Sequence, residues 1–130
     1  MTINNKEKRI SQIINSYRES RGLLPLRFDT LVAQVAREHS AAMAEGRVPF
    51  GHDDFDRRVE RLTEERPNKI VSENIASFNG YPLNEDIVVQ FWLKSEKHTR
   101  VIQDDYQLTG IGIARNNTRT YFITQIFVRE

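Results

Sequence analysis

The amino-acid sequence predicts an α+β domain, and two observations carry this prediction. Apolar residues recur at helical spacing through the first half of the chain, whereas they alternate at strand spacing near its end. Helices that come first and a hairpin that comes last are typical of an α+β order. The length of 130 residues suits one compact domain with a single core. We expect residues 1–7 to be an N-terminal tail and residues 8–130 to be this domain.

The composition excludes several classes of protein. There are 19 Lys and Arg residues and 18 Asp and Glu residues, so the net charge of +1 gives no sign of a nucleic-acid-binding surface. No apolar run approaches the ~20 residues that span a bilayer. Cysteine is absent, which excludes disulfides, thiolate metal sites and cysteine nucleophiles. The start, MTINNKEKRI, lacks the apolar segment of a signal peptide, so a cytoplasmic chain and a mature or truncated secreted chain both stay open.

Three helices are predicted in the first half. The first, capped by Asn4 or Asn5 and ended by Gly22, has an apolar face at i, i+3, i+4 and i+7, made of Ile10, Ile13, Ile14 and Tyr17. The second follows Asp29 as its N-cap and ends at Gly46, with an apolar face made of Leu31, Val32, Val35, Ala36, His39 and Met43. A shorter third helix begins near Asp53 or Asp54, with Phe55, Val59 and Leu62 on one side.

The second half mixes strands with one helix. After a loop at residues 66–69, residues 70–78 are predicted to be extended, and a turn follows at residues 79–82. Asn84 can cap a fourth helix, whose apolar residues are Ile87, Val88, Phe91 and Trp92. Residues 108–114 and 121–128 indicate two strands, with Gly110 and Gly112 marking a close backbone approach or a bulge. Residues 115–119 favour a hairpin turn, because Asn tolerates positive φ.

The three histidines differ in their surroundings. His39 shares a helix face with apolar residues, which predicts a core or boundary residue that makes one hydrogen bond. His52 precedes the third helix and is either a loop bystander or a ligand or acid/base group at a loop edge. His98 follows the fourth helix in the hexapeptide SEKHTR, where it could interact with the helix C-terminus, although Lys97 would do so equally well.

Glu73 is the residue that a purely structural role explains least well. It lies in an otherwise apolar extended run, where a carboxylate must be exposed or paired. With His52 and His98 it would complete a known zinc ligand set, but their spacings of 21 and 25 residues match no local metal motif. A triad built on Ser72 or Ser95 is a weaker alternative, because no nucleophile-elbow pattern surrounds either serine.

Several short motifs occur in a characteristic order. They are INSYR (14–18) with GLLPL (22–26), the pattern of the second helix around His39, FGH (50–52), SENIA (72–76), WLKSEKH (92–98), GIGIA (110–114) and YFITQIF (121–127). In this order they resemble the bacterial-type CAP domain, also called the SCP domain. It belongs to the superfamily of cysteine-rich secretory proteins, insect-venom antigens and plant pathogenesis-related proteins. The resemblance covers residues 8 to 130.

The resemblance implies a three-layer α-β-α sandwich with a small central, mainly antiparallel sheet. It also implies that His52, Glu73 and His98 converge in one cleft, where His52 and His98 could bind zinc or another divalent cation. Ser95 lies in this cleft where secreted eukaryotic members have a glutamate. Because most members are secreted, the resemblance favours a secreted or cell-envelope location.

Three functions suit such a cleft. The first is a binding module for a divalent metal, another small molecule, a lipid or a peptide. The second is a metal-dependent, peptidase-like hydrolase, with Glu73 as a ligand or general base beside a metal-bound water. The third is a structural interaction module with a vestigial cleft. Ser95 removes one acidic group from the site and no other acid/base pair is evident, so the sequence favours binding over catalysis.

Overall fold

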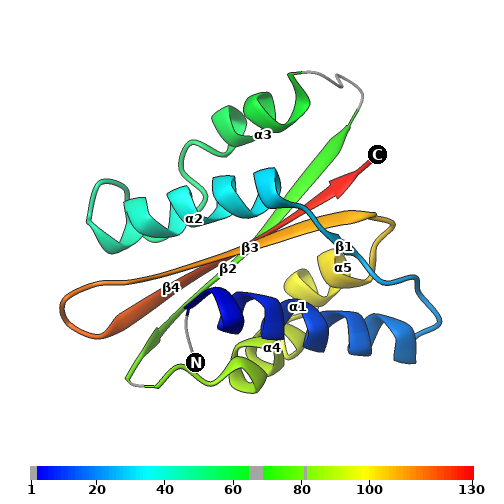
Figure 1. The fold of residues 1–130 in the computed structure, drawn as a ribbon, viewed down its shortest axis with the longest axis horizontal. Helices are drawn as coiled ribbons and strands as arrows, with labels where there is room; N and C mark the ends of the chain where they lie inside the picture. Colours follow the sequence, from blue (N-terminus) through cyan, green and yellow to red (C-terminus); the bar gives the residue numbers. More distant parts are fainter. Residues whose placement is uncertain (1–2, 65–68, 81) are drawn as a thin grey trace.

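The computed structural model describes residues 3–64, 69–80 and 82–130, and its helices and strands confirm the α+β class (Figure 1). The turn and loop predicted at Tyr81 and at residues 66–68 lie outside the described residues. The elements in chain order are α1 (Ile3–Ser20), β1 (Arg27–Phe28), α2 (Thr30–Ala44), α3 (Phe55–Thr63), β2 (Ile70–Asn79), α4 (Glu85–Leu93), α5 (Glu96–Gln103), β3 (Leu108–Arg115) and β4 (Thr120–Arg129).

The four strands form one sheet in the order β1-β3-β4-β2. β3 and β4 are the predicted hairpin and pair antiparallel, with Ile113 opposite Ile123. β2 pairs antiparallel with β4 along its whole length, and only the short β1 runs parallel to its neighbour. The sheet is therefore mainly antiparallel, and β2 forms one of its two outer edges.

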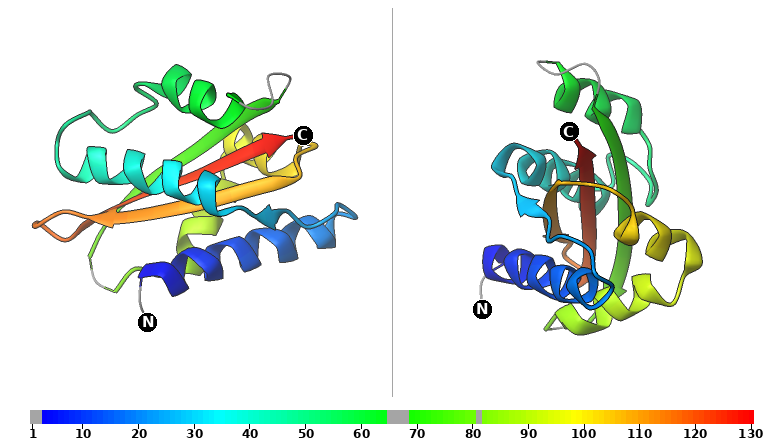
Figure 2. Two further views of the ribbon diagram at one scale, coloured as in Figure 1. Left: turned by 45° about the horizontal axis from the view of Figure 1, so that its top comes forward. Right: turned by 90° about the vertical axis from the view of Figure 1, so that its right-hand side faces the viewer.

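Helices cover both faces of this sheet, which confirms the three-layer sandwich (Figure 2). On one face α1, α4 and α5 enclose the larger core, where Trp92, Phe127 and Ile14 are fully buried. On the other face α2 covers a smaller core that includes Val35 and Ile126. None of the described helices combines the length and the apolar character needed to cross a membrane.

N-cap residues mark the starts of α2 and α4. As predicted, Asp29 and Asn84 cap these helices, because their side chains accept hydrogen bonds from backbone N–H groups one turn ahead, at 3.0 and 3.2 Å.

The glycines of β3 let α2 lie close to the sheet. A Cβ added to Gly112 would lie 2.2 Å from the backbone nitrogen of Arg37 in α2. This confirms the close backbone approach that the two glycines of β3 predict.

One helix boundary differs from the sequence prediction, and one helix was not predicted. α1 begins at Ile3, so residues 3–7 are helical rather than a tail. The physical reason is Glu7, which is buried and accepts hydrogen bonds from Arg37 and from the backbone N–H of Ile113. The sequence also missed α5, which begins at Ser95 as its N-cap. His98 therefore lies in the first turn of a new helix and not at the end of α4.

The buried face of α4 is narrower than predicted. Val88 and Trp92 are buried, but Ile87 and Phe91 are 51% and 46% exposed. In the hairpin, the turn at residues 115–119 is confirmed, although the positive φ falls on Arg119 rather than on an asparagine.

Candidate functional site

Glu73 lies at the centre of the candidate site, and its carboxylate is paired. It projects from β2 with a side chain that is 1% exposed. Arg58 of α3 donates two hydrogen bonds to it, from Nε to Oε1 at 2.7 Å and from Nη2 to Oε2 at 2.8 Å. This two-pronged geometry is the strongest common pairing of arginine with a carboxylate. It explains how an acidic residue is accommodated inside an apolar strand.

His52 is the second partner of Glu73. Its Nδ1 lies 2.7 Å from Oε2 of the carboxylate. Because a carboxylate only accepts, Nδ1 is the donor, and Nε2 has no hydrogen-bond partner among the described residues. The side chain of His52 is 41% exposed, so this nitrogen is accessible to a ligand. His52 and Glu73 are thus two sequence-predicted site residues that are in direct contact.

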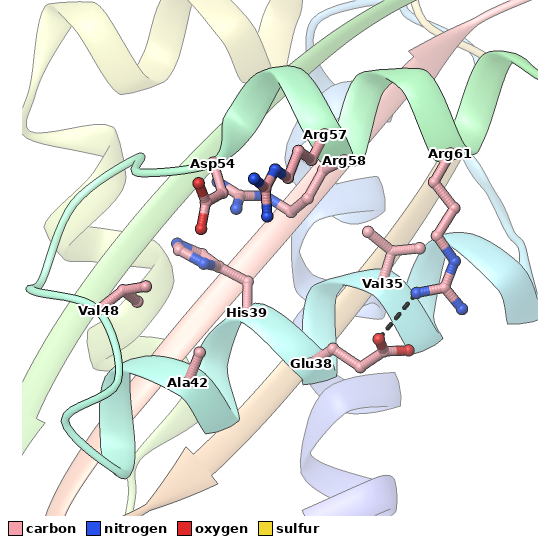
Figure 3. A pocket seen from close by; sticks show the side chains of 9 residues that line it. All are labelled: Val35, Glu38, His39, Ala42, Val48, Asp54, Arg57, Arg58 and Arg61. Atoms are coloured by element: carbon pink, nitrogen blue, oxygen red, sulfur yellow. Dashed lines mark hydrogen bonds and ion pairs between the residues drawn. The ribbon is translucent and has the colours of Figure 1, made fainter.

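Two further contacts hold the loop that carries His52. His39 of α2 is buried, and its Nε2 donates to the carbonyl of Gly51 at 2.8 Å. Arg58 Nη1 donates to the carbonyl of Asp53, also at 2.8 Å. Burial lowers the pKa of His39, so the ring is neutral and fits the predicted role of a core histidine with one hydrogen bond. Figure 3 shows His39 facing Arg58 across the space between α2 and α3.

His98 is attached to β2 through its backbone. The side chain of Asn74, the neighbour of Glu73, donates to the carbonyl of His98 at 3.1 Å. Ser95 caps α5 by accepting from the backbone N–H of His98 at 3.4 Å. The hydroxyl of Ser95 is thus used within the helix, which gives it a structural role one turn from the site.

The ring of His98 lies beside apolar and cationic neighbours. Its centroid is 6.0 Å from that of Phe91. Burial, followed by the charges of Lys97 and His52, lowers the pKa of His98. No hydrogen bond joins His98 to His52 or Glu73 in the described part of the chain. The Nδ1 atom of His98 is buried and has no hydrogen-bond partner among the residues that the structure describes.

The ligand set implied by the resemblance is only partly assembled around Glu73, because His52 contacts the carboxylate and the ring of His98 makes no hydrogen bond to it among the described residues. Among the described residues, no group of three or more His, Asp or Glu side chains is placed to hold a metal ion. Both oxygens of Glu73 already accept hydrogen bonds from Arg58 and His52, and a guanidinium repels a nearby cation. Zinc binding by His52 and His98 is thus an expectation from the resemblance alone, and the contacts of Glu73 argue against it.

A partly exposed aromatic pair adjoins His98. Phe78 of β2 and Phe91 of α4 pack edge to face, with centroids 5.4 Å apart and an angle of 82° between their planes. β2 thus carries a polar group, in which His52 and Arg58 meet Glu73, and, five residues further along, an apolar group made of these two rings.

Sequence reasoning missed Arg58. The signal was present, since a carboxylate predicted inside an apolar strand requires a partner. The chain has 19 basic residues, however, and nothing local distinguishes the one that reaches Glu73.

Comparison with known proteins agrees with the fold and the motif order. Residues 12–127 match the family described as CAP, the cysteine-rich secretory protein family. Over 128 residues the chain is 32% identical to a Bacillus subtilis (strain 168) protein named "Uncharacterized membrane protein YlbC". The match covers 95% of this chain and 34% of that protein, so the chain spans about a third of the length of this curated relative.

Solved structures share the architecture. An extracellular protein containing an SCP domain from Bacillus anthracis str. Ames is 26% identical, with a TM-score of 0.81 over 98% of this chain and 41% of that chain. An outer surface protein from Borrelia burgdorferi has a TM-score of 0.83 at 20% identity, over 100% of this chain and 96% of that chain. With an α-β-α fold shared by these structures and a family match over most of its length, the chain belongs to the CAP family of cysteine-rich secretory proteins.

Proposed function

We propose that this CAP domain is a binding module that takes a peptide segment beside β2, between His52 and Phe91, without chemical turnover. The observation that carries the proposal is the state of Glu73. Its two oxygens accept hydrogen bonds from Arg58 and His52. The buried carboxylate therefore holds α3 and the loop before it against β2. A general base must instead have a free oxygen within reach of the proton that it removes.

The groups left available suit a peptide. His52 offers Nε2 as an acceptor for a backbone N–H, and Phe91 offers a half-exposed ring for an apolar side chain. Both lie against β2, one of the two outer strands of the sheet, with His52 at Glu73 and Phe91 at Phe78. A peptide presents backbone N–H donors and apolar side chains at short intervals, so it can bind the acceptor of His52 and the ring of Phe91 together.

A hydrolase is the second candidate, and the His52–Glu73 pair is the observation that favours it. A carboxylate that orients an imidazole is a recurring part of acid/base sites. Arg58 weakens this candidate, because it balances the negative charge that would otherwise stabilise a protonated His52. Binding is therefore the function that the geometry supports better.

The test is a titration of the purified chain with a synthetic library of short random peptides, followed by mass spectrometry of the bound fraction. We expect an enriched set with aromatic or aliphatic side chains, and its members should leave at their original masses. Binding should be lost in His52→Ala and in Phe91→Ser. Leu24→Ser is the matched control, because Leu24 is 82% exposed in the loop between α1 and β1.

Other outcomes would redirect the proposal. Peptides recovered as fragments, with cleavage abolished by Glu73→Gln, would establish the hydrolase. No enrichment, or enrichment that His52→Ala and Phe91→Ser leave unchanged, would contradict peptide binding at this site. Parallel titrations with Zn²⁺ and with oleate test whether the site binds a metal ion or a lipid instead of a peptide.

We also propose that the domain works outside the cytoplasm or at the cell envelope. The support is the Bacillus anthracis relative, which is described as an extracellular protein, and the Bacillus subtilis relative, which is named a membrane protein. Fractionation of cells that express the native gene tests this. Recovery of the domain in the cytosolic fraction alone would contradict it.

A further inference from the structure

A pocket between α2 and α3 has an apolar floor and a charged rim (Figure 3). Its volume is about 230 Å³, slightly below the ~300–1,000 Å³ typical of pockets for drug-sized ligands. The pocket therefore suits a smaller molecule. The floor and inner wall consist of Val35, Ala42 and Val48, together with the neutral ring of His39.

Most charges on the rim are already balanced. Arg61 donates to Glu38 at 2.8 Å, and the guanidinium of Arg58 is bonded to Glu73. The two remaining charged residues are Asp54 and Arg57. In the described part of the chain, neither side chain takes part in a hydrogen bond or ion pair.

Asp54 occupies the N-cap position of α3 but does not cap the helix. Aspartate at this position normally accepts a hydrogen bond from a backbone N–H of the first turn. Here no such bond forms, and the backbone takes the left-handed conformation, with φ of 64° and ψ of 19°. The carboxylate is thereby left unbonded at the mouth of the pocket. Non-glycine residues in this conformation are concentrated at functional sites.

Arg57 lies three residues after Asp54, the spacing at which opposite charges on a helix normally pair. Both line the pocket, yet no ion pair joins them. An anion and a cation are thus held separately at the edge of one small apolar pocket. The ligand that matches this arrangement carries both charges close together and a compact apolar group.

From these observations we infer that the pocket between α2 and α3 binds a free α-amino acid with an aliphatic side chain, whose ammonium pairs with Asp54 and whose carboxylate pairs with Arg57. The carboxylate accepts from the guanidinium as in other arginine–carboxylate pairs. The side chain lies on Val35, Ala42 and Val48. The site adjoins the proposed peptide site, because Asp54 and Arg57 also line a second pocket that includes His52, but it uses neither His52 nor Phe91 as a ligand.

The test is calorimetric titration of the full chain with three probes. L-leucine carries both charges, N-acetyl-L-leucine lacks the ammonium, and L-leucinamide lacks the carboxylate. We expect leucine to bind at least about tenfold more tightly than either blocked probe, since each lost charge-assisted hydrogen bond has about this effect. Amide resonances of Val35 and Val48 should shift with leucine in NMR spectra.

Two variants assign the charges. In Asp54→Asn, leucine and N-acetyl-leucine should bind about equally, because the partner of the ammonium is gone. In Arg57→Gln, leucine and leucinamide should bind about equally. The controls Asp56→Asn and Arg100→Gln, which change exposed charges that do not line this pocket, should leave the affinity for leucine unchanged.

Three results would overturn the inference. They are no binding of leucine at millimolar concentration, equal binding of all three probes to the native chain, and a charge preference that Asp54→Asn and Arg57→Gln leave unchanged. Circular dichroism of each variant excludes unfolding as the cause of a loss. A failure here can be told apart from a failure of peptide binding, because the probes and the substituted residues are different.

Discussion

Arg58 and Glu73 form a buried two-pronged ion pair that attaches α3 to the outer strand of the sheet, with N–O distances of 2.7 and 2.8 Å. Within α3, Arg58 alone is buried. This pair therefore helps to position the helix that borders both the candidate site and the amino-acid pocket, together with Leu62, which packs on the smaller core.

Arg58→Ala is expected to lower the free energy of unfolding by about 3–5 kcal/mol, because it leaves the carboxylate of Glu73 buried without its main partner. Urea denaturation monitored by circular dichroism measures this. The matched control is Arg61→Ala on the same helix, whose pair with Glu38 is exposed and should contribute about 0–1 kcal/mol. A loss below about 1 kcal/mol for Arg58→Ala would show that α3 is held by other contacts.

Stability should fall as the pH falls from 7 to 5. Burial lowers the pKa of His39 in the folded chain, so the unfolded chain binds a proton below its ordinary pKa of about 6.5 before the folded chain does. This contribution is present above pH ~6.5 and is lost as the pH approaches the lower folded pKa. The lowered pKa of His98 acts in the same direction.

His39→Gln isolates this effect, because glutamine keeps an N–H donor for the carbonyl of Gly51 but does not titrate. Urea denaturation of both proteins at pH 8, 7, 6 and 5 should give a shallower decline for the variant below pH 7. Parallel declines would mean that His39 does not contribute to the pH dependence.

Trp92 and Phe91 are neighbours in α4 with opposite surroundings. Trp92 is fully buried, and its Nε1 donates to the carbonyl of Ile75 at 2.9 Å. Trp92→Ala should therefore cost about 3–5 kcal/mol in chemical denaturation. Phe91→Ala should cost less than about 1 kcal/mol, because the ring is half exposed. Equal losses would contradict the described orientation of α4.

Asp54→Gly should stabilise the chain by up to about 1 kcal/mol, because glycine adopts the left-handed conformation without the steric cost that aspartate pays. The control is Asp56→Gly within the first turn of α3, where glycine should destabilise by about 0.5–1 kcal/mol. Thermal unfolding measures both. A destabilised Asp54→Gly would show that the carboxylate supports the fold instead of being available to a ligand.

The sequence predicted the elements whose signals are local. The caps Asp29 and Asn84 bond to backbone groups one turn away, so their residue types alone marked two helix starts. α5 was missed because Ile102 is its one buried residue, which leaves no apolar periodicity to recognise. The start of α1 was missed because the contacts of Glu7 reach Ile113, far along the chain.

The candidate site was predicted in part, because short motifs mark some of its residues and long-range packing brings in the others. The motifs pointed to His52 and Glu73, and these two are in contact. Arg58 joins them only through the packing of α3 against β2, which no local pattern encodes. The amino-acid pocket likewise depends on the way α3 stands against α2.

Calorimetric titration of Zn²⁺ into the chelator-treated chain at neutral pH tests most directly whether Glu73 is committed to Arg58 and His52. We predict no binding at micromolar affinity for the native chain, and a gain of affinity in Arg58→Ala, which frees the carboxylate as a ligand beside the imidazoles. Micromolar or tighter binding by the native chain that disappears in His52→Ala/His98→Ala would contradict the account. It would show that the ion pair gives way to a metal centre.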